Sequence, residues 1–362
     1  MQTKTLRQIN EELKNKTTTV EALVDASKKV IQENEGEVHA LLGLYSDALV
    51  TSQIKKAEKM FEDGISTLLT GIPIVLKDNI LVQGETATGG SKILENYVAT
   101  YDATVVKKLK DAGAILLGRA NMDEFAMGGS TENSAYGVTK NPFDTTKVAG
   151  GSSGGSAAVV AYGGVSVSLG SDTGGSIRQP ASFCGLVGLK TTYGGTSRYG
   201  LMAMGSSLDQ IGPFAHSVED AQVVYEIITG HDPRDSTSLA PELRAAKKSP
   251  LKKVIGVPRV FIDRPGIDKE VLSNFNESIK KLENAGYAIQ DIAIQELDKA
   301  LSVYYVVMFA EVSSNLARYD GIRYGLSHPG ETSIRSYFES RTAGFGKEVR
   351  RRILLGTYVL SS

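Results

Sequence analysis

Residues 149–156, AGGSSGGS, and residues 170–178, GSDTGGSIR, are the two most unusual segments of this chain. Positions 121–200 hold 17 of its 38 glycines. Glycine loses more backbone entropy on folding than any other residue, so this density favours loops whose N–H groups approach a ligand. A flexible Gly/Ser linker has a similar composition. However, the intervening residues 157–162 and 165–169 are predicted to form a buried helix and a strand, so we expect functional loops inside a folded domain.

The composition is that of an ordinary globular protein. The chain is 41% hydrophobic and 22% charged, and its 362 residues suit one large α/β domain or two smaller ones. Its net charge of −1 excludes a global basic surface for nucleic acid and leaves a local patch open. Cys184 is the single cysteine, so an internal disulfide is excluded, and its apolar neighbours predict a buried structural thiol.

The sequence predicts neither a signal peptide nor a membrane span. Residues 1–4 lack the apolar core of a signal peptide, and no uninterrupted apolar run reaches membrane-spanning length. We therefore expect a cytoplasmic protein that does not associate with a membrane.

The order of the predicted elements indicates an α/β fold. Residues 1–65 are predicted to be a mainly helical scaffold without a visible site. A buried strand at 71–76, a helix at 102–111 and a strand at 114–118 follow. This alternation predicts a mixed, mostly parallel twisted sheet that is covered by helices on both faces. We divide the chain into an N-terminal helical part, 1–65, and a main domain, 66–362, and expect one structural domain overall.

The second half of the chain continues the alternation. Residues 232–253 are polar, contain prolines and are rich in lysine, which predicts a linker or a surface excursion. The segment 304–317 is apolar on nearly all sides, which predicts a buried helix. Further strands are expected at 185–189, 201–204 and 254–257, and further helices at 217–229 and 268–285.

Lys77 directly follows the apolar strand at 71–76. Ligand sites of α/β sheets collect beyond the carboxyl ends of the strands. Most lysines are plain surface residues, but this position favours partial burial. Burial lowers the pKa of a lysine from about 10.4 and converts the side chain into a base.

A helix is predicted over 347–360, with one apolar stripe from Val349 to Leu360. Arg352 lies nearest this stripe, and an arginine that leans into an apolar face needs an anionic partner. A structural salt bridge and a ligand-binding role explain this arginine equally well. The chain then stops at 361–362 without a cap or a polar tail, and we expect it to be a piece of a longer protein.

Three serine-based designs fit a Gly/Ser-rich core. The segment 150–154 matches the G-x-S-x-G nucleophile elbow, but such a match is common in this composition and a polar loop precedes it. None of the four histidines lies in a convincing context for a Ser-His-Asp triad, and a phosphate-binding loop lacks its G-x-x-x-x-G-K-[ST] motif.

The third design is a Ser–Lys system, in which a neutral lysine replaces histidine as the base. Lys77, Ser152 and Ser176 are then expected to meet at one edge of the sheet. We also expect an oxyanion hole made by four backbone amides, those of Thr173, Gly174, Gly175 and Ser176.

Over residues 69–213 the order of these motifs closely resembles the amidase signature family. The resemblance rests on the two Gly/Ser segments together with GIP at 71–73 and KDN at 77–79. It implies a Ser-cisSer-Lys triad: Ser176 is the acyl-forming nucleophile, Ser152 the bridging serine that follows a cis peptide, and Lys77 the base.

Within that family the chain resembles the A-subunit branch of the tRNA-dependent amidotransferases. This closer resemblance rests on the segments 198–200, 206–213, 313–325 and 345–349. It implies that glutamine is hydrolysed and that the ammonia converts Glu-tRNA(Gln) to Gln-tRNA(Gln) in a partner subunit, which uses ATP and Mg²⁺. The implied assembly is a heterotrimer with the B and C subunits, and no metal or cofactor is implied for this chain. In the same pattern, Tyr304 and Arg352 resemble residues that hold the glutamine.

A stand-alone amidase of the same family, which acts on small amides, is the alternative. Arg352 distinguishes the two hypotheses, because only a glutamine-specific site needs a clamp for a carboxylate. A non-enzymatic scaffold would give no reason for the combination of Lys77, Ser152 and Ser176.

Overall fold

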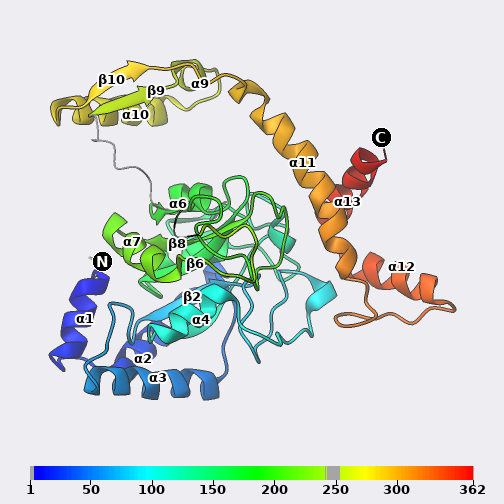
Figure 1. Ribbon diagram of the computed structural model, residues 1–362, viewed down its shortest axis with the longest axis horizontal. Coiled ribbons are helices and arrows are strands. Elements are labelled where there is room, and N and C mark those ends of the chain that lie inside the picture. Colours follow the sequence, from blue (N-terminus) through cyan, green and yellow to red (C-terminus); the bar gives the residue numbers. More distant parts are fainter. Residues whose placement is uncertain (1–3, 241, 243–252, 362) are drawn as a thin grey trace. The chain divides into compact units, whose positions relative to one another are not determined.

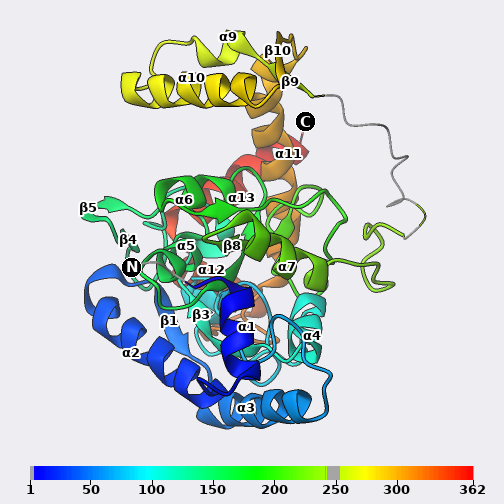
Figure 2. The same ribbon diagram turned by 90° about the vertical axis from the view of Figure 1, so that its left-hand side faces the viewer.

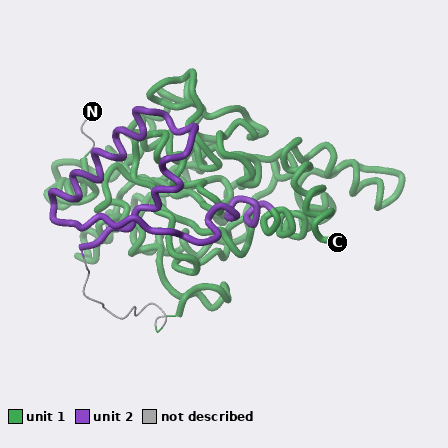
Figure 3. Tube along the Cα trace, turned by 90° about the horizontal axis from the view of Figure 1, so that it is seen from above, with its two compact units in different colours: residues 1–242, 306–362 green, residues 243–305 purple. Residues whose placement is uncertain are grey.

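The structure, a computed structural model, describes residues 4–240, 242 and 253–361. The chain divides into two compact units, one of residues 1–242 and 306–362 and the other of residues 243–305 (Figure 3). Residues 1–65 belong to the first unit together with the sheet. Much of the linker predicted at 232–253 lies outside the described residues.

A six-stranded sheet forms the centre of the first unit, in the order β1-β3-β2-β6-β8-β7. Strand β2 pairs in parallel with β3 and with β6, whereas β1 and β8 join the sheet antiparallel. The predicted mixed, mostly parallel sheet is therefore confirmed. The strands are Leu41–Leu44 (β1), Pro73–Lys77 (β2), Ile115–Ala120 (β3), Val167–Asp172 (β6), Val187–Gly188 (β7) and Gln210–Ala215 (β8).

Two further features lie beside this sheet. A short antiparallel hairpin joins Lys140–Asn141 (β4) to Asp144–Val148 (β5). The strand predicted at 201–204 is wrong, because that segment makes only an isolated bridge between Leu201 and Ile80.

Helices cover both sides of the sheet, as Figures 1 and 2 show. Helix α5 contacts β2, β3, β6 and β8, while α2, α3 and α7 contact β2, β3 and β8 respectively. The helices are Leu6–Lys14 (α1), Val20–Val38 (α2), Asp47–Glu62 (α3), Thr104–Asp111 (α4), Gly154–Ala161 (α5), Arg178–Phe183 (α6) and Val218–Ile228 (α7), with short 3₁₀ turns at Lys92–Leu94 (η1) and Glu124–Ala126 (η2).

The two Gly/Ser segments are held together by α5 and β6. Seven of the eight residues of α5 are buried, and all six residues of β6 are buried. Ser156 Oγ donates to the Leu169 carbonyl at 2.9 Å, and Ser168 Oγ donates to the Ser156 carbonyl at 2.7 Å. These buried hydrogen bonds lock the helix onto the strand, so the loop before α5 and the loop after β6 have fixed positions.

Three helices follow the second unit's sheet: Ala300–Asn315 (α11), Ser333–Gly344 (α12) and Lys347–Leu360 (α13). The prediction that 304–317 is a buried helix is wrong, since only Met308, Val312 and Leu316 are buried there. An apolar composition favours the burial of a helix. Whether the helix is buried depends on which other segments of the chain pack against it. The helical segment Leu297–Arg318 has the length and composition of a membrane-crossing helix, a test that helices of soluble proteins also pass.

The second unit pairs Val254–Val257 (β9) in parallel with Ala288–Asp291 (β10). Its helices are Arg259–Ile262 (α9) and Lys269–Asn284 (α10), followed by the turn Leu297–Lys299 (η3). The strand predicted at 254–257 is thereby confirmed, and the helix predicted at 268–285 agrees to within one residue at each end.

Candidate active site

Lys77 is the last residue of β2, and its side chain is fully buried. Its Nζ lies 2.7 Å from Ser152 Oγ, 2.9 Å from Ser171 Oγ and 3.4 Å from the Ser171 carbonyl oxygen. The all-apolar β2 continues into this lysine without a break, so the amine is delivered into the protein interior and not to its surface. The structure therefore brings together two of the three predicted catalytic residues.

The surroundings of Lys77 favour the neutral amine. Burial lowers the pKa of the ammonium to about 7, against the opposing effect of the carboxylates of Asp123, Asp172 and Asp209. Near neutral pH, Lys77 is therefore uncharged in a large fraction of the molecules, and its nitrogen then has a free lone pair. Such an amine 2.7 Å from a hydroxyl has the geometry of a general base.

The loop that carries Ser152 contains the predicted cis peptide bond, between Gly151 and Ser152. The Gly151 N–H donates to Gln179 Oε1 at 2.9 Å, and the Ser152 carbonyl accepts from the Asp123 N–H at 3.2 Å. Ser152 is fully buried. The loop is thus held from both sides, by the start of α6 and by the segment before η2.

Close backbone approach explains two of the glycines here. A Cβ atom at Gly151 would collide with the carboxylate of Asp123, and one at Gly155 would collide with the backbone oxygens of Ala40 and Asn121. Any side chain at these two positions would push the Ser152 loop away from Lys77. Glycine is therefore required by packing, which differs from the flexible-linker interpretation of the same composition.

Asp172, the last residue of β6, shapes the loop that carries Ser176. Its carboxylate accepts the N–H groups of Gly175 at 2.8 Å and Ile177 at 3.1 Å. It also accepts Nε and Nη2 of Arg178 at 3.1 and 3.0 Å. Burial alone would raise the pKa of Asp172, but these donors lower it below its ordinary value. The carboxylate is therefore charged, and it holds the turn in one conformation.

The predicted oxyanion hole agrees only in part with this geometry. The Gly175 N–H is already committed to Asp172, so this amide is not available to a ligand in the structure. Within the described chain, the amides of Thr173, Gly174 and Ser176 have no hydrogen-bond acceptor. These three remain candidates for the hole.

Ser176 lies on the same loop and is 8% exposed, whereas Ser152 is completely buried. Among the described residues, its hydroxyl makes no hydrogen bond with Ser152 or Lys77. Ser176 is thus the more exposed of the two serines, and its proton transfer to Ser152 stays a prediction.

The two predicted glutamine-binding residues belong to different units, Arg352 to the first and Tyr304 to the second. Arg352 is buried on α13 beside Val349, and its Nε donates to Glu348 Oε1 at 2.7 Å. The predicted apolar stripe is shorter than expected, because Leu360 is exposed. Tyr304 belongs to the second unit, where its ring contacts Tyr305, and its role stays a prediction from the resemblance.

Three polar residues of the site were not predicted. Ser171 and Asn79 join the hydrogen-bond network of Lys77, since Asn79 Nδ2 donates to Ser171 Oγ at 3.0 Å. Asp209 accepts from Thr173 Oγ1 at 2.6 Å, and burial raises its pKa to about 6. The motif KDN at 77–79 was the one available signal for Asn79.

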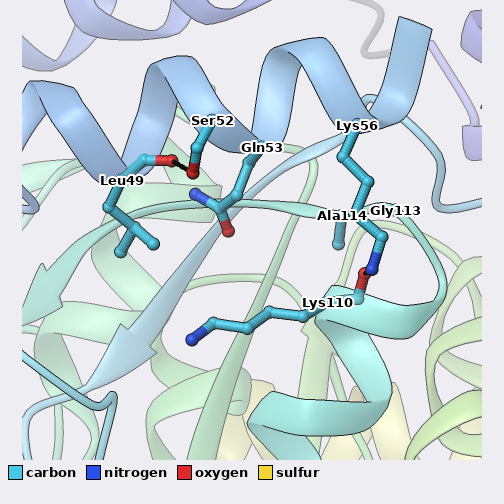
Figure 4. A pocket seen from close by; sticks show the side chains of 7 residues that line it. All are labelled: Leu49, Ser52, Gln53, Lys56, Lys110, Gly113 and Ala114. Carbon is cyan, nitrogen blue, oxygen red and sulfur yellow. Dashed lines mark hydrogen bonds between the residues drawn. The ribbon is translucent and has the colours of Figure 1, made fainter. Parts of the chain in front are cut away.

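Other features of the described chain lie away from this site. A cavity of about 250 Å³ opens between α3 and the end of α4, and none of the predicted site residues lines it (Figure 4). No cluster of three or more metal-ligating side chains forms within the ranges that the structure covers. Cys184 is buried, as predicted, and burial raises the pKa of its thiol to about 12.

Comparison with known proteins adds the family to this geometry. Residues 22–362 match the family model described as Amidase. A relative from Thermoanaerobacter pseudethanolicus, named as the A subunit of glutamyl-tRNA(Gln) amidotransferase, is 50% identical over 99% of this chain and 74% of its own length.

Two solved structures extend the comparison. The crystal structure of the A subunit of glutamyl-tRNA(Gln) amidotransferase from Thermotoga maritima has a TM-score of 0.74 and 41% identity, over 94% of this chain and 68% of that one. A native peptide amidase from Stenotrophomonas maltophilia has a TM-score of 0.78 and 25% identity, over 96% and 74% of the two chains.

Proposed function

This chain belongs to the amidase family, and from that premise we propose that it hydrolyses glutamine as the ammonia-supplying component of a glutamyl-tRNA(Gln) amidotransferase. The observation that carries the chemistry is the buried contact of 2.7 Å between Lys77 Nζ and Ser152 Oγ. The choice of substrate is supported by the 50% identity to a relative that is named as the A subunit of this enzyme.

The first half of the reaction forms an acyl-enzyme. The neutral amine of Lys77 takes the Ser152 proton, and Ser152 takes the Ser176 proton. Ser176 Oγ then attacks the side-chain amide carbon of glutamine. The negative charge that develops on the carbonyl oxygen is stabilised by the amides of Thr173, Gly174 and Ser176.

The second half releases both products. Lys77 returns its proton through Ser152 to the departing nitrogen, the C–N bond breaks and ammonia leaves. A water molecule then attacks the γ-glutamyl ester, giving up its proton through Ser152 to Lys77. Cleavage of the ester frees glutamate, and the proton returns from Lys77 through Ser152 to the Ser176 oxygen, so Lys77 and the two serines end in their starting states.

The ammonia is used elsewhere in the proposed assembly. Glu-tRNA(Gln) is activated with ATP and Mg²⁺ by a partner, and the B and C subunits complete a cytoplasmic heterotrimer. Arg352 and Tyr304 are the proposed contacts for glutamine. Arg352 has to exchange Glu348 for the α-carboxylate of the substrate, or share itself between the two, because it is paired in the structure.

That pairing also favours a second candidate function. If Glu348 keeps Arg352, the site has no carboxylate clamp and suits small amides, as in a stand-alone amidase. The similarity to a peptide amidase at a TM-score of 0.78 supports this alternative.

Glutaminase activity of the protein tests the choice between the two. Ammonia release is measured with glutamine and with a small amide, with and without the B and C subunits and Glu-tRNA(Gln). Stimulation of glutamine hydrolysis by the partners and the tRNA is expected. Hydrolysis of small amides that ignores both additions would overturn the proposal in favour of the alternative.

A further inference from the structure

Asn79 is a buried polar residue beside the catalytic lysine that the mechanism above does not use. It lies in the turn after β2 and is 1% exposed. Its Nδ2 donates to Ser171 Oγ at 3.0 Å. Its Oδ1 is the one buried side-chain nitrogen or oxygen without a hydrogen-bond partner in the part of the chain that the structure describes. The Nδ2 donor of Asn79 is thus hydrogen-bonded next to the catalytic base, whereas its Oδ1 acceptor has no partner among the described residues.

Ser171 connects this amide to the base. Its Oγ accepts from Asn79 Nδ2 at 3.0 Å and from Lys77 Nζ at 2.9 Å. A hydroxyl has two lone pairs and one proton. In this arrangement both lone pairs of Ser171 are used, so its own proton is directed away from the lysine.

The direction of these bonds matters once Lys77 is neutral. A neutral amine has two N–H groups and one lone pair, and three acceptor oxygens surround Nζ: Ser152 Oγ, Ser171 Oγ and the Ser171 carbonyl. Catalysis needs the lone pair to face Ser152. If the Ser171 hydroxyl turned and donated to Nζ, the amine would donate to Ser152 and accept no proton from it.

We propose that Asn79 is a positioning residue that keeps Ser171 Oγ an acceptor and thereby directs the lone pair of neutral Lys77 to Ser152. Its N–H occupies one direction around the Ser171 oxygen. Its unpaired carbonyl, on the same amide, becomes an acceptor for the Ser171 proton when the amide turns over. This inference rests on the proposed Ser-Ser-Lys mechanism.

A purely structural role makes the opposite prediction. Asn79→Ala removes an acceptor without a partner, which favours folding, and also the Nδ2 hydrogen bond to Ser171, whose loss disfavours folding. If Asn79 only filled space, the Asn79→Ala variant would be as active as the wild type. The positioning role predicts a loss of turnover in the folded protein, whatever the change in its stability.

A charged variant supplies an independent readout. The charged groups that face Lys77 are the carboxylates of Asp123, Asp172 and Asp209. Asn79→Asp adds a fourth carboxylate, which only the Ser171 hydroxyl separates from the amine of Lys77. A nearby opposite charge favours the ammonium form. The acidic limb of the pH profile of kcat/KM should therefore move to higher pH, by about 1 to 3 units.

The experiment measures kcat, KM, pH profile and thermal unfolding for the protein assembled with its partner subunits. Asn79→Ala is expected to lower kcat about 10- to 100-fold, a part of what a general base contributes, with little change in KM. In a Ser171→Ala background, Asn79→Ala should have no further effect, because Asn79 acts through Ser171. Asn10→Ala is the matched control: this buried amide of α1 donates to the Thr67 carbonyl at 2.8 Å, and its loss should lower stability only.

The outcomes separate this inference from the proposed function. An unchanged kcat in Asn79→Ala, or an unmoved acidic limb in Asn79→Asp, overturns the inference. If the wild type hydrolyses small amides and not glutamine, the proposed substrate fails, and the same variants test Asn79 on the small amide. A wild type that hydrolyses no amide overturns both.

Discussion

Arg178 forms a bidentate ion pair with Asp172 across the loop that carries Ser176, with N···O distances of 3.0 and 3.1 Å. Asp172 is the last residue of β6, so this pair fastens the loop to the edge of the sheet. Bidentate pairs of arginine and carboxylate fix direction as well as distance. Ser176, the proposed nucleophile, is therefore positioned by a carboxylate that never needs to touch the substrate.

Replacement of Asp172 by asparagine should uncouple this loop from the sheet. An amide cannot accept all the donors that Asp172 now satisfies, so we expect kcat to fall at least about 10-fold and stability to fall by about 1–3 kcal/mol. Urea unfolding and glutamine turnover measure the two effects. Asp320→Asn is the control, because Asp320 also pairs with an arginine, Arg323, and its carboxylate accepts from Ile322 and Arg323. An unchanged kcat would contradict the positioning role of Asp172.

Chemical labelling should distinguish the two serines that we propose to be catalytic. Ser176 is 8% exposed and Ser152 is fully buried, so an electrophilic sulfonyl fluoride should modify Ser176 alone. Mass spectrometry of the digested protein locates the label. Ser176→Ala should abolish the labelling, and Ser152→Ala should slow it by removing the relay to Lys77. A label on Ser152 in the Ser176→Ala variant would reverse the assigned roles.

The buried lysine should make stability depend on pH above neutrality. The pKa of Lys77 is about 7 in the folded protein and about 10.4 in the unfolded chain. Between these values only the unfolded chain holds the proton, so this group makes stability rise with pH, by on the order of a few kcal/mol. Lys77→Met should remove that rise and abolish hydrolysis. Urea unfolding from pH 7 to 10 provides the comparison, and equal slopes for the two proteins would refute the low pKa.

Glu124 should give the opposite dependence below neutrality. Its buried carboxyl accepts from Ser91 Oγ and from the Gly346 N–H, at the start of α13, and burial raises its pKa to about 7. Between about pH 4.3 and 7 the unfolded chain loses a proton that the folded protein keeps, so stability falls as the pH rises.

Glu124→Gln keeps an acceptor for Gly346 and removes the titration. From pH 5 to 7 the stability of the wild type relative to this variant should fall by about 2–3 kcal/mol. Thermal unfolding over this range measures the difference. A constant difference would show that Glu124 is charged throughout.

Arg352 and Arg351 form a matched pair for testing glutamine recognition. Both donate to Glu348, but Arg352 is buried and Arg351 is exposed. Arg352→Gln should raise KM for glutamine at least about 10-fold, the effect of a lost charge-assisted bond to the α-carboxylate. Arg351→Gln should leave KM unchanged. Equal values of KM for both variants would assign Arg352 to the salt bridge alone.

The sequence predicted the helices and strands whose formation depends mainly on residues within the segment itself. The helix at 347–360 and the strand at 254–257 have the predicted bounds, because their periodicity and end signals lie within the segments. Strand β8, Gln210–Ala215, was not predicted, since it contains Gly212 and Pro213, which are unfavourable in strands. Its pairing with β6 overrides that preference.

The candidate site shows the same difference between features that depend on one segment and contacts between distant segments. Lys77 was found because an apolar strand ends at it, and its burial is a local consequence. Its contact with Ser171 joins residues 94 positions apart, and it depends on the parallel register of β2 and β6, which no local pattern reveals. Asn79 was missed for the same reason. Arg352 was correctly predicted to turn inward, but its partner Glu348 was not identified.

The close packing around Gly151 and Gly155 has a consequence for enzyme engineering. The position of Ser152 depends on backbone atoms of Ala40 and Asn121 and on the Asp123 carboxylate, all of them outside the proposed triad. Grafting a lysine and two serines onto another scaffold would transfer the reactive groups without the close packing that positions them. A transplant of this catalyst has to carry the loop before α5 and the segments that press against it as a single unit.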